Sequence, residues 1–597
     1  MSDRRASNCS AGVLLAAGMS VSAMPAQAQK AVQEDDGGIQ EVVVTAEKRS
    51  ESVQQVPIAI SAFDGNSLQE RGVGSVSQLA ALSPNVNLDS GVSFTSSTAV
   101  LAASIRGIGA SDFAFNIDPA VGIYVDGVYL ARSVGANQDL LDVQRIEILK
   151  GPQGTLFGRN TVGGAISIVT RDPGKEFAVR GDVTVGRFNL LEVRGSVDLP
   201  VSDVVSTSLT ADVKTRNGYA KRLPFPDSAV FNTRSYTAYP AAEFESPSRE
   251  GDEDSRTIRG KIRYDGGRLR FTVGADYQYA EGAAPTKLLL TTENVPGTFA
   301  NLYNACIGLP TATLQAAGIL NACSSSGTQY PSVRRNVITP VARLYGLAGV
   351  NADGNPNNDV LPYDSRFLTN SPDTSYANGN NYSHLTNWGA TASGEYEISD
   401  DVLLKSITAY RKSHWTSGLD GDGSPINMST YSFDQKQNQF SQEFQLVGAM
   451  PQAHLNYVLG AYYFKESGSL VDYVMSGEGL YIIDGPNWLD TKNYATFGQL
   501  DFRPNDFLGV TVGARYTHED KTFEGGQQEL NGLFYKLAGN VCSNLQGDVT
   551  PGALLPNGQT CRVGNNYPDP NNPLRLYPPG TNKLAFDNFS PKVGVQL

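Results

Sequence analysis

The sequence predicts a mainly β protein in which an N-terminal α+β domain precedes a transmembrane antiparallel β-barrel. Three observations predict this fold. From about residue 178, apolar and polar residues alternate with a period of two, as in Leu269–Tyr279 and Leu508–Tyr516. The connections between such segments alternate between short turns and long loops, as in outer-membrane barrels. After residue 28, no apolar run reaches the roughly 18 residues that a membrane-spanning helix needs.

The first element, residues 1–28, has the features of a secretory signal peptide. Arg4 and Arg5 give it a basic start, Ala11–Ala23 is small and apolar, and an Ala-Gln-Ala sequence ends it at residue 28. A disordered alanine-rich tail is the alternative. We therefore expect an exported protein.

Residues Gln144–Arg171 are the most informative stretch of the next region. Two short apolar strands, Arg145–Leu149 and Ala165–Val169, flank a segment dense in glycine, which permits tight turns and close backbone approach. Two further blocks, Ser104–Gly109 and Val121–Tyr129, precede it. A phosphate-binding loop is the alternative, but no Gly-Lys-Ser/Thr sequence follows the glycines and the next segment is β-branched.

These three blocks, in this order, resemble the plug domain of TonB-dependent outer-membrane receptors, and we expect that domain over residues 52–171. The resemblance implies a barrel of about 22 strands with the plug inside its lumen. The alternating pattern yields about 12 strands within residues 175–597. We therefore expect an incomplete barrel, in a receptor truncated at its C-terminus because the gene is partial or the chain is a fragment.

A β-prone segment at residues 39–46 lies before the plug, within a tail (29–51) that we expect to be flexible and periplasmic. The segment resembles a TonB box, which would add a strand to the edge of a sheet in TonB. The alternative is the first strand of the plug. The residues expected to bind TonB are Glu41, Val42, Val43, Val44, Thr45 and Ala46.

The resemblance also implies ion pairs between plug arginines and barrel glutamates that face the lumen. Arg106 matches one plug arginine, and Lys150 stands where a second arginine is usual, which weakens bidentate pairing there. Glu443 is the candidate partner on the barrel. Ordinary lumen charges without this role are the alternative.

Four cysteines follow the signal peptide, in pairs separated by 17 and 19 positions. Each pair lies in its own polar segment, which favours the local disulfides Cys306–Cys323 and Cys542–Cys561 in an oxidising compartment, although four cysteines allow three pairings. Neither pair has the close spacing of a zinc site.

Composition and scattered polar residues argue against other classes of function. The net charge is −13 and no basic stripe is present, so we expect no nucleic-acid partner. The four histidines are dispersed and suggest no catalytic group, so we expect no enzyme activity and no cofactor. Residues 353–364 resemble a calcium loop only weakly, because Asn358 replaces the turn glycine, and we expect no metal site.

The resemblance implies active transport of a scarce ligand across the outer membrane of a Gram-negative bacterium, where lipid surrounds the barrel. TonB, with its inner-membrane partners ExbB and ExbD, would supply the energy. A ferric siderophore is the expected cargo by analogy with the family, and an oligosaccharide or cobalamin is the alternative. A passive porin and a secreted enzyme or adhesin are alternatives of other classes, which the plug blocks and the strand–loop alternation disfavour.

Overall fold

A computed structural model describes residues 43–49, 51–54, 56–90, 95, 97–225, 247–283, 289, 292, 296–320, 322–323, 362–505, 507–530, 533, 575–577 and 580–596. All of them belong to one compact unit, Val42–Leu597. The other unit, Met1–Glu41, which includes the expected signal peptide, lies outside the described residues.

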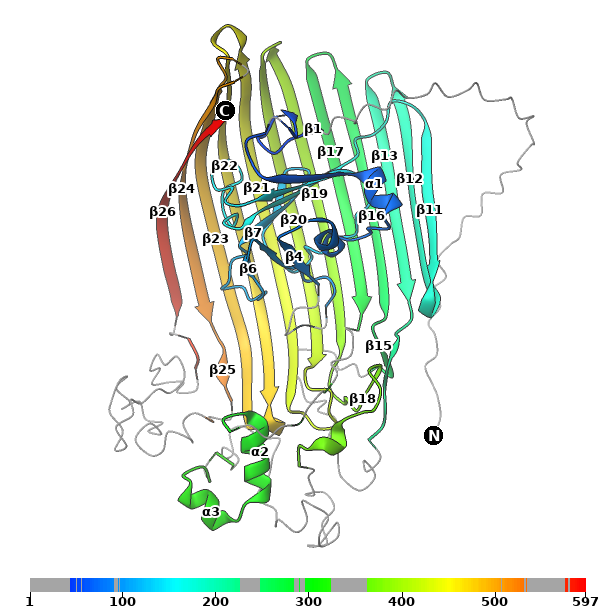
Figure 1. The fold of residues 1–597 in the computed structure, drawn as a ribbon, viewed down its shortest axis with the longest axis vertical. Coiled ribbons are helices and arrows are strands. Elements are labelled where there is room, and N and C mark those ends of the chain that lie inside the picture. Colours follow the sequence, from blue (N-terminus) through cyan, green and yellow to red (C-terminus); the bar gives the residue numbers. More distant parts are fainter. Residues whose placement is uncertain are drawn as a thin grey trace, which may run out of the picture. The chain divides into compact units, whose positions relative to one another are not determined.

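A large antiparallel sheet forms the wall of this unit (Figure 1), and twelve of its strands pair in chain order. They are β11 (Ala178–Gly186), β12 (Leu190–Ser202), β13 (Val205–Arg216), β16 (Glu253–Gly266), β17 (Leu269–Gly282), β19 (Tyr382–Ser399), β20 (Val402–Asp420), β21 (Ser429–Met450), β22 (Leu455–Ser476), β23 (Tyr481–Phe502), β24 (Gly509–Gly525) and β26 (Thr581–Gln596). A short strand, β25 (Gln528–Glu529), pairs with β23. The number of long strands matches the sequence-based expectation, and among the described residues β11 and β26 end the path.

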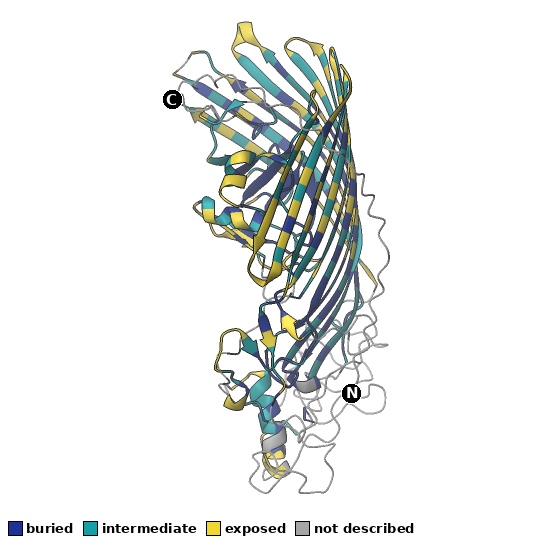
Figure 2. Ribbon diagram, turned by 90° about the vertical axis from the view of Figure 1, so that its right-hand side faces the viewer, coloured by how far each residue is buried: buried dark blue, intermediate teal, exposed yellow. Residues whose placement is uncertain are grey.

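Side chains alternate between the two faces of the wall, so that exposed and buried positions succeed each other along each strand (Figure 2). Apolar residues such as Val183, Ile262 and Leu459 are exposed on one face. Polar residues such as Asp212 and Gln439 are buried on the other. This arrangement presents an apolar surface to lipid and a polar surface to the lumen.

The connections at one end of the wall are short. β16 and β17 are joined through Gly267, whose φ of 60° suits the tight turn, and a single 3-10 turn, η5 (Pro451–Ala453), joins β21 to β22. The opposite end carries the long connections, which join β13 to β16, β17 to β19 and β24 to β26. At the same end, short 3-10 turns join β11 to β12 and β22 to β23. Short turns in outer-membrane barrels face the periplasm, so the end with the turns β16–β17 and β21–β22 is the periplasmic one.

No helix among the described residues is both long enough and apolar enough to cross a membrane.

The plug is a small α+β domain enclosed on one side by the wall. Its main sheet has the order β3 (Ile60–Asp64), β9 (Val143–Lys150), β10 (Gly164–Thr170), β7 (Val121–Val125) and β8 (Val128–Leu130), with β10 and β7 parallel. A second sheet contains β4 (Val86–Asp89), β5 (Ala102–Ile105) and β6 (Ile108–Ala110). Helix α1 (Gly65–Glu70) begins at Asp64, whose side chain accepts the Ser67 N–H at 3.0 Å. The 3-10 helix η1 (Val76–Leu82) begins with a capping box formed by Ser75 and Gln78.

The glycines of the most informative block serve close packing. Gly164 has a φ of 149°, and a Cβ atom there would lie 2.2 Å from the Leu149 carbonyl oxygen on the neighbouring strand. Gly158 has a φ of 89°, and a Cβ atom there would lie 2.6 Å from the Arg515 guanidinium of the wall. These positions therefore accept only glycine without displacement of a neighbour.

Smaller elements gather at the end of the long connections. The strands β14 (Ala220–Arg222), β15 (Arg249–Glu250) and β18 (Thr374–Ser375) form one sheet. The helices are α2 (Phe299–Gly308) and α3 (Thr311–Ala316), with 3-10 turns η2 (Arg187–Asn189), η4 (Ser365–Phe367) and η6 (Gly477–Gly479). Near the periplasmic end, β1 (Val43–Val44) pairs with β2 (Glu51–Ser52).

Candidate functional site

The expected TonB box lies at the start of the described chain. Glu41 and Val42 are outside the described residues, and Val43 and Val44 form β1, which pairs with β2 in a sheet separate from that of the plug. Val44 and Ala46 are fully buried against plug residues, whereas Val43 is 48% exposed. The segment is therefore docked on one side and accessible on the other.

Thr45 ties this segment to the middle of the plug. Its N–H and its hydroxyl both donate to Oε1 of Glu147, at 2.8 and 3.1 Å, and Arg145 donates to the Thr45 hydroxyl at 2.9 Å. Glu147 and Arg145 belong to β9, which pairs with both β3 and β10. The box thus contacts the strand that organises the main plug sheet.

The three residues after the box form ion pairs with the wall. Lys48 contacts Glu443 on β21 at 3.2 Å, and Arg49 contacts Asp501 on β23 at 3.0 Å. Lys592 on β26 contacts Glu47 at 2.9 Å. We name the segment Val43–Arg49 the strap, because one part of it is held by the plug and the other by the wall.

Glu443 was expected to pair with Arg106 or Lys150 of the plug, and this expectation was wrong about the plug residues. Glu443 faces the plug, but its cation is Lys48, and Gln445 donates to the same carboxylate at 2.6 Å. Arg106 lies in the turn between β5 and β6 with a φ of 54° and is exposed. Lys150 donates to a backbone carbonyl oxygen of the plug, that of Pro84, at 3.1 Å. Burial, followed by the nearby Arg106 cation, lowers the pKa of Lys150. The two cations therefore lie close to each other in the plug.

The plug arginine that does hold a barrel glutamate is Arg132, which the sequence analysis missed. Its Nε and Nη2 donate to the two carboxylate oxygens of Glu466 on β22 at 2.7 and 2.8 Å, and both side chains are buried. Nη1 donates to the carbonyl oxygen of Phe115 at 3.0 Å, and the guanidinium lies over the Phe115 ring. The alternating pattern of the predicted strand places Glu466 on its inward face, which could have marked this glutamate as a contact of the plug. Nothing in the sequence marked Arg132 as its partner.

A second ionic cluster joins the plug to β24. Arg159 contacts Asp118 at 3.3 Å and Glu519 at 3.5 Å, and Lys521 also pairs with both acids. Burial alone would raise the pKa of Asp118, but Arg159 and Lys521 outweigh it and lower that pKa. Asp118 therefore stays ionised and holds its two cations.

An aromatic cluster closes the contact on the side of the long connections. Phe113 of the plug meets Trp415 of β20 and Phe433 of β21 edge to face, with ring centroids 5.2 and 4.8 Å apart. Trp415 is fully buried. Such contacts fix the height of the plug in the lumen.

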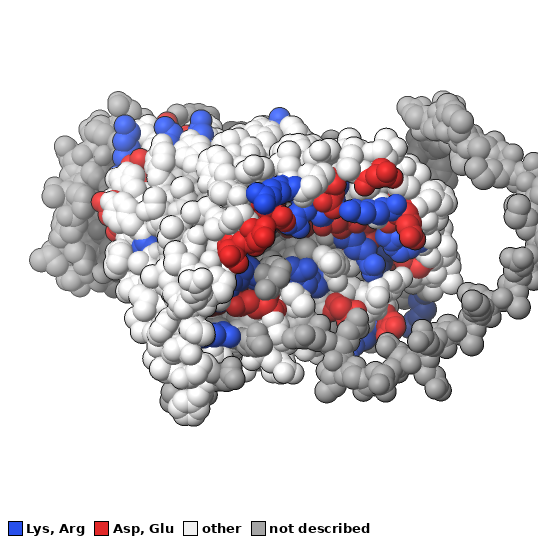
Figure 3. Space-filling model, turned by 90° about the horizontal axis from the view of Figure 1, so that it is seen from above, with Lys and Arg blue, Asp and Glu red and all other residues white. Residues whose placement is uncertain are grey.

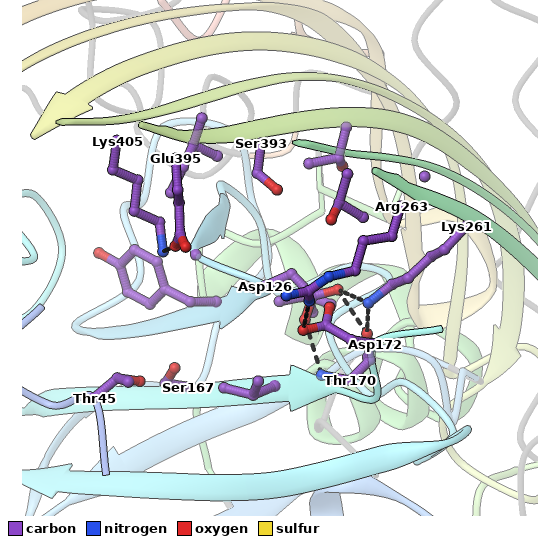
Figure 4. Close-up of a pocket in the computed structure, with 18 of the residues that line it drawn as sticks. Thr45, Asp126, Ser167, Thr170, Asp172, Lys261, Arg263, Ser393, Glu395 and Lys405 are labelled. Atoms are coloured by element: carbon purple, nitrogen blue, oxygen red, sulfur yellow. Dashed lines mark hydrogen bonds and ion pairs between the residues drawn. The ribbon is translucent and has the colours of Figure 1, made fainter. Parts of the chain in front are cut away.

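A cavity of about 320 Å³ lies between β7 and β10 of the plug and the wall strands β16, β17, β19 and β20 (Figure 4). Lys261 of the wall reaches Asp126 of the plug at 3.1 Å, and Arg263 pairs with Asp172. Burial alone would raise the pKa of Asp126, but Lys261, Arg259 and the donors of Thr170 lower it. Charged side chains gather around a hollow in the face seen from the periplasmic end (Figure 3).

The outer loops are packed around their own small core. A disulfide joins Cys306 of α2 to Cys323, the pairing expected from the sequence, and both cysteines are buried with Tyr303 and Phe367. Cys542 and Cys561 lie outside the described residues, as does the weak calcium-like segment at 353–359. Within the described ranges, no group of three or more His, Cys, Asp or Glu could hold a metal ion.

Comparison with known proteins agrees with this architecture. Residues 52–165 match the family model of the TonB-dependent receptor plug domain, and residues 329–597 match that of the TonB-dependent receptor-like β-barrel. Together, these matches take in more than half of the chain.

Individual relatives are similar over parts of the chain. The pesticin receptor of Yersinia pestis is 37% identical over 133 residues, which are 22% of this chain and 19% of that protein. The iron-regulated outer membrane virulence protein of Vibrio cholerae is 30% identical over 235 residues, 37% of this chain and 31% of that protein. The chain thus matches about a third or less of these relatives.

A solved structure shows the same fold. The ferric yersiniabactin uptake receptor FyuA of Yersinia pestis superposes with a TM-score of 0.57 at 17% identity, over 90% of this chain and 62% of that one. With the two family models, the plug sheet and the long antiparallel wall around it lead to one assignment. The chain belongs to the family of TonB-dependent receptors of the outer membrane.

Proposed function

We propose that this protein is an active transporter that takes up a scarce ligand across the outer membrane and receives its energy from TonB, with ExbB and ExbD. The outer membrane has no ATP, so energy must arrive mechanically. The observation that carries the proposal is the attachment of Thr45 to Glu147 on β9. A pull on the box would reach β9, which pairs with both β3 and β10 of the main plug sheet, through this contact.

A ferric siderophore is the proposed cargo. The names of the similar proteins support this choice, since one is iron-regulated and another takes up ferric yersiniabactin. An oligosaccharide or cobalamin would use the same mechanical coupling, so the cargo must be tested separately from the mechanism.

A passive porin is the alternative of another class. The plug argues against it, because Arg132, Arg159 and Phe113 contact wall strands and hold the plug against the inner face of the wall. A porin would also give no reason for a docked strand at Val43–Val44.

Uptake by whole cells tests the proposal. Val43→Pro removes a backbone donor and disfavours strand pairing with TonB, so it should abolish uptake and leave ligand binding intact. Val43→Thr is the control, since it keeps the N–H group and β-branching. The probes are iron-55 ferric yersiniabactin, cobalamin and a maltooligosaccharide, each in hosts with and without TonB. Normal uptake by a well-expressed Val43→Pro variant would contradict the TonB-box role, and uptake independent of TonB would indicate a porin.

A further inference from the structure

The cavity between plug and wall has an uneven charge. Its lining carries eight cationic and four acidic side chains. Three of the cations pair with acids beside the lining, Lys48 with Glu443, Arg145 with Glu147 and Arg270 with Glu397, which leaves an excess of one cation. The cations are Lys48, Arg145, Arg259, Lys261, Arg263, Arg270, Lys405 and Arg411, and the acids are Asp126, Asp172, Asp276 and Glu395. Serine and threonine side chains fill much of the remaining lining, so the surface is polar as well as cationic.

Three of these cations occupy successive inward positions of one strand. Arg259, Lys261 and Arg263 alternate with the outward residues Gly260 and Ile262 along β16, so all three side chains face the plug. A row of like charges on one face is costly unless anions lie opposite. The row on β16 therefore needs acidic groups opposite it.

The anions opposite this row come from the plug. Asp126 pairs with Lys261, and Asp172 pairs with Arg263, as Figure 4 shows. Asp126 is fixed in place by the N–H and hydroxyl of Thr170, at 2.8 and 2.7 Å. In the docked plug, these two carboxylates therefore occupy the positions that an anionic ligand would take on the wall.

The strap forms another part of the same cavity. Thr45 and Lys48 both line it, and Lys48 lies over the Phe157 ring, 4.9 Å from its centroid. Movement of the strap toward the periplasm would remove both residues from the lining. The cavity would then widen on the side of the strap.

We propose that this cavity is an anion-binding chamber on the exit route of the cargo, and that the cargo is an anionic chelate bearing carboxylate or phenolate groups. In the docked plug, the carboxylates of Asp126 and Asp172 occupy the positions that the anionic groups of this chelate would take. When the plug shifts, Lys261 and Arg263 exchange the plug carboxylates for those of the cargo. This inference rests on the proposed transport function and names the chemical class of its substrate.

A thiol placed in the chamber tests its charge without any knowledge of the cargo. Ser393→Cys puts a sulfur in the lining, in a chain whose Cys9, Cys542 and Cys561 are replaced by serine. The measurement is the ratio of reaction rates of two methanethiosulfonates, the anionic sulfonatoethyl and the cationic trimethylammonioethyl reagents. The chamber should favour the anionic reagent over the cationic one, relative to their rates with a free thiol.

Two further substitutions should move this ratio in opposite directions. Asp172→Asn frees Arg263 and should raise the ratio severalfold, whereas Arg263→Gln should lower it by a similar factor at low salt. Arg256→Gln is the matched control, because Arg256 lies on the same strand but on the outward face, with its side chain 61% exposed. It should leave the ratio unchanged.

A ratio that favours the cationic reagent, or that moves in neither variant, would overturn the proposal. The reagents need no uptake, so this result is independent of the Val43→Pro experiment. Loss of anion preference with intact TonB-dependent uptake would reject the chamber and keep the transporter. Anion preference without such uptake would support the charge of the chamber and reject its role in transport.

Discussion

The buried pair between Arg132 and Glu466 should determine how firmly the plug is seated. Glu466→Gln keeps the size of the side chain and one carbonyl acceptor, but it removes the negative charge and the second acceptor. Both partners lie almost entirely out of solvent, with side chains 4% and 0% exposed. Arg132 would then keep its charge in a buried site with its counterion lost.

The magnitude follows from the geometry of the pair. Breaking a buried ion pair costs about 3–5 kcal/mol, and a hydrogen bond to a charged group contributes about 1.5–3 kcal/mol. Because one hydrogen bond and the contacts to Phe115 remain, we expect a loss of about 2–4 kcal/mol in plug docking. With an m value of about 2 kcal/mol per molar, the urea midpoint should fall by roughly 1–2 M.

Tryptophan fluorescence provides the assay. Trp415 is fully buried and meets Phe113 of the plug, so its emission should change when the plug leaves the wall. Trp388 and Trp488 are 40% and 43% exposed on the outer face and should contribute a constant background. Urea titration of the detergent-solubilised protein then reports undocking.

The control is Asp254→Asn, which breaks a pair whose arginine side chain is 61% exposed and should change the free energy of undocking by less than about 1 kcal/mol. The double variant Arg132→Met with Glu466→Met should recover much of the loss, since it leaves no buried charge. An unchanged midpoint in Glu466→Gln would refute the role of this pair in docking.

Three further perturbations act on single features of the fold. Burial raises the pKa of Asp139 to about 6, so the docked plug disfavours its ionised form. Docking should weaken by about 1–2 kcal/mol as the pH rises from about 4 to above 6, and Asp139→Asn should remove this dependence of the urea midpoint. Gly164→Ala should destabilise the plug by more than about 2 kcal/mol and make it sensitive to protease, whereas Gly195→Ala, with no atom within 4 Å of the added carbon, should not. Cys323→Ser removes the disulfide to Cys306 and should lower the stability of the loop between them by about 3 kcal/mol. Faster proteolysis of α2 and α3 would show this loss.

The fold could be predicted from the sequence where a local pattern determines the structure. Period-two alternation predicted the faces of the wall strands, and the glycine-dense block was predicted to lie between two strands, which are β9 and β10. In that block, Gly164 is required because a backbone carbonyl oxygen lies where a Cβ atom would be. Such requirements are visible in a single sequence, since the residues that impose them are close in the chain.

The contacts between plug and wall were not predictable in the same way. Arg132 and Glu466 are 334 positions apart, and Lys48 and Glu443 are 395 apart. Alternation shows that Glu443 and Glu466 face the lumen, but the height of each along the lumen depends on every strand register between them. For this reason the resemblance suggested Arg106 and Lys150 for Glu443, whereas the strap supplies its cation.

The strap also implies an order of events for the proposed transport. A pull from the periplasm travels along the chain from Val43, so it meets the hydrogen bonds of Thr45 to Glu147 before the ion pair of Lys48 with Glu443. The first step loads β9 and hence the plug sheet, and the second removes Lys48 from the cavity lining. If both contacts broke together, the plug would receive no force before the chamber opened. The sequential arrangement therefore predicts that weakening Lys48–Glu443 alone opens the chamber without moving the plug, whereas weakening Thr45–Glu147 uncouples the pull from the plug.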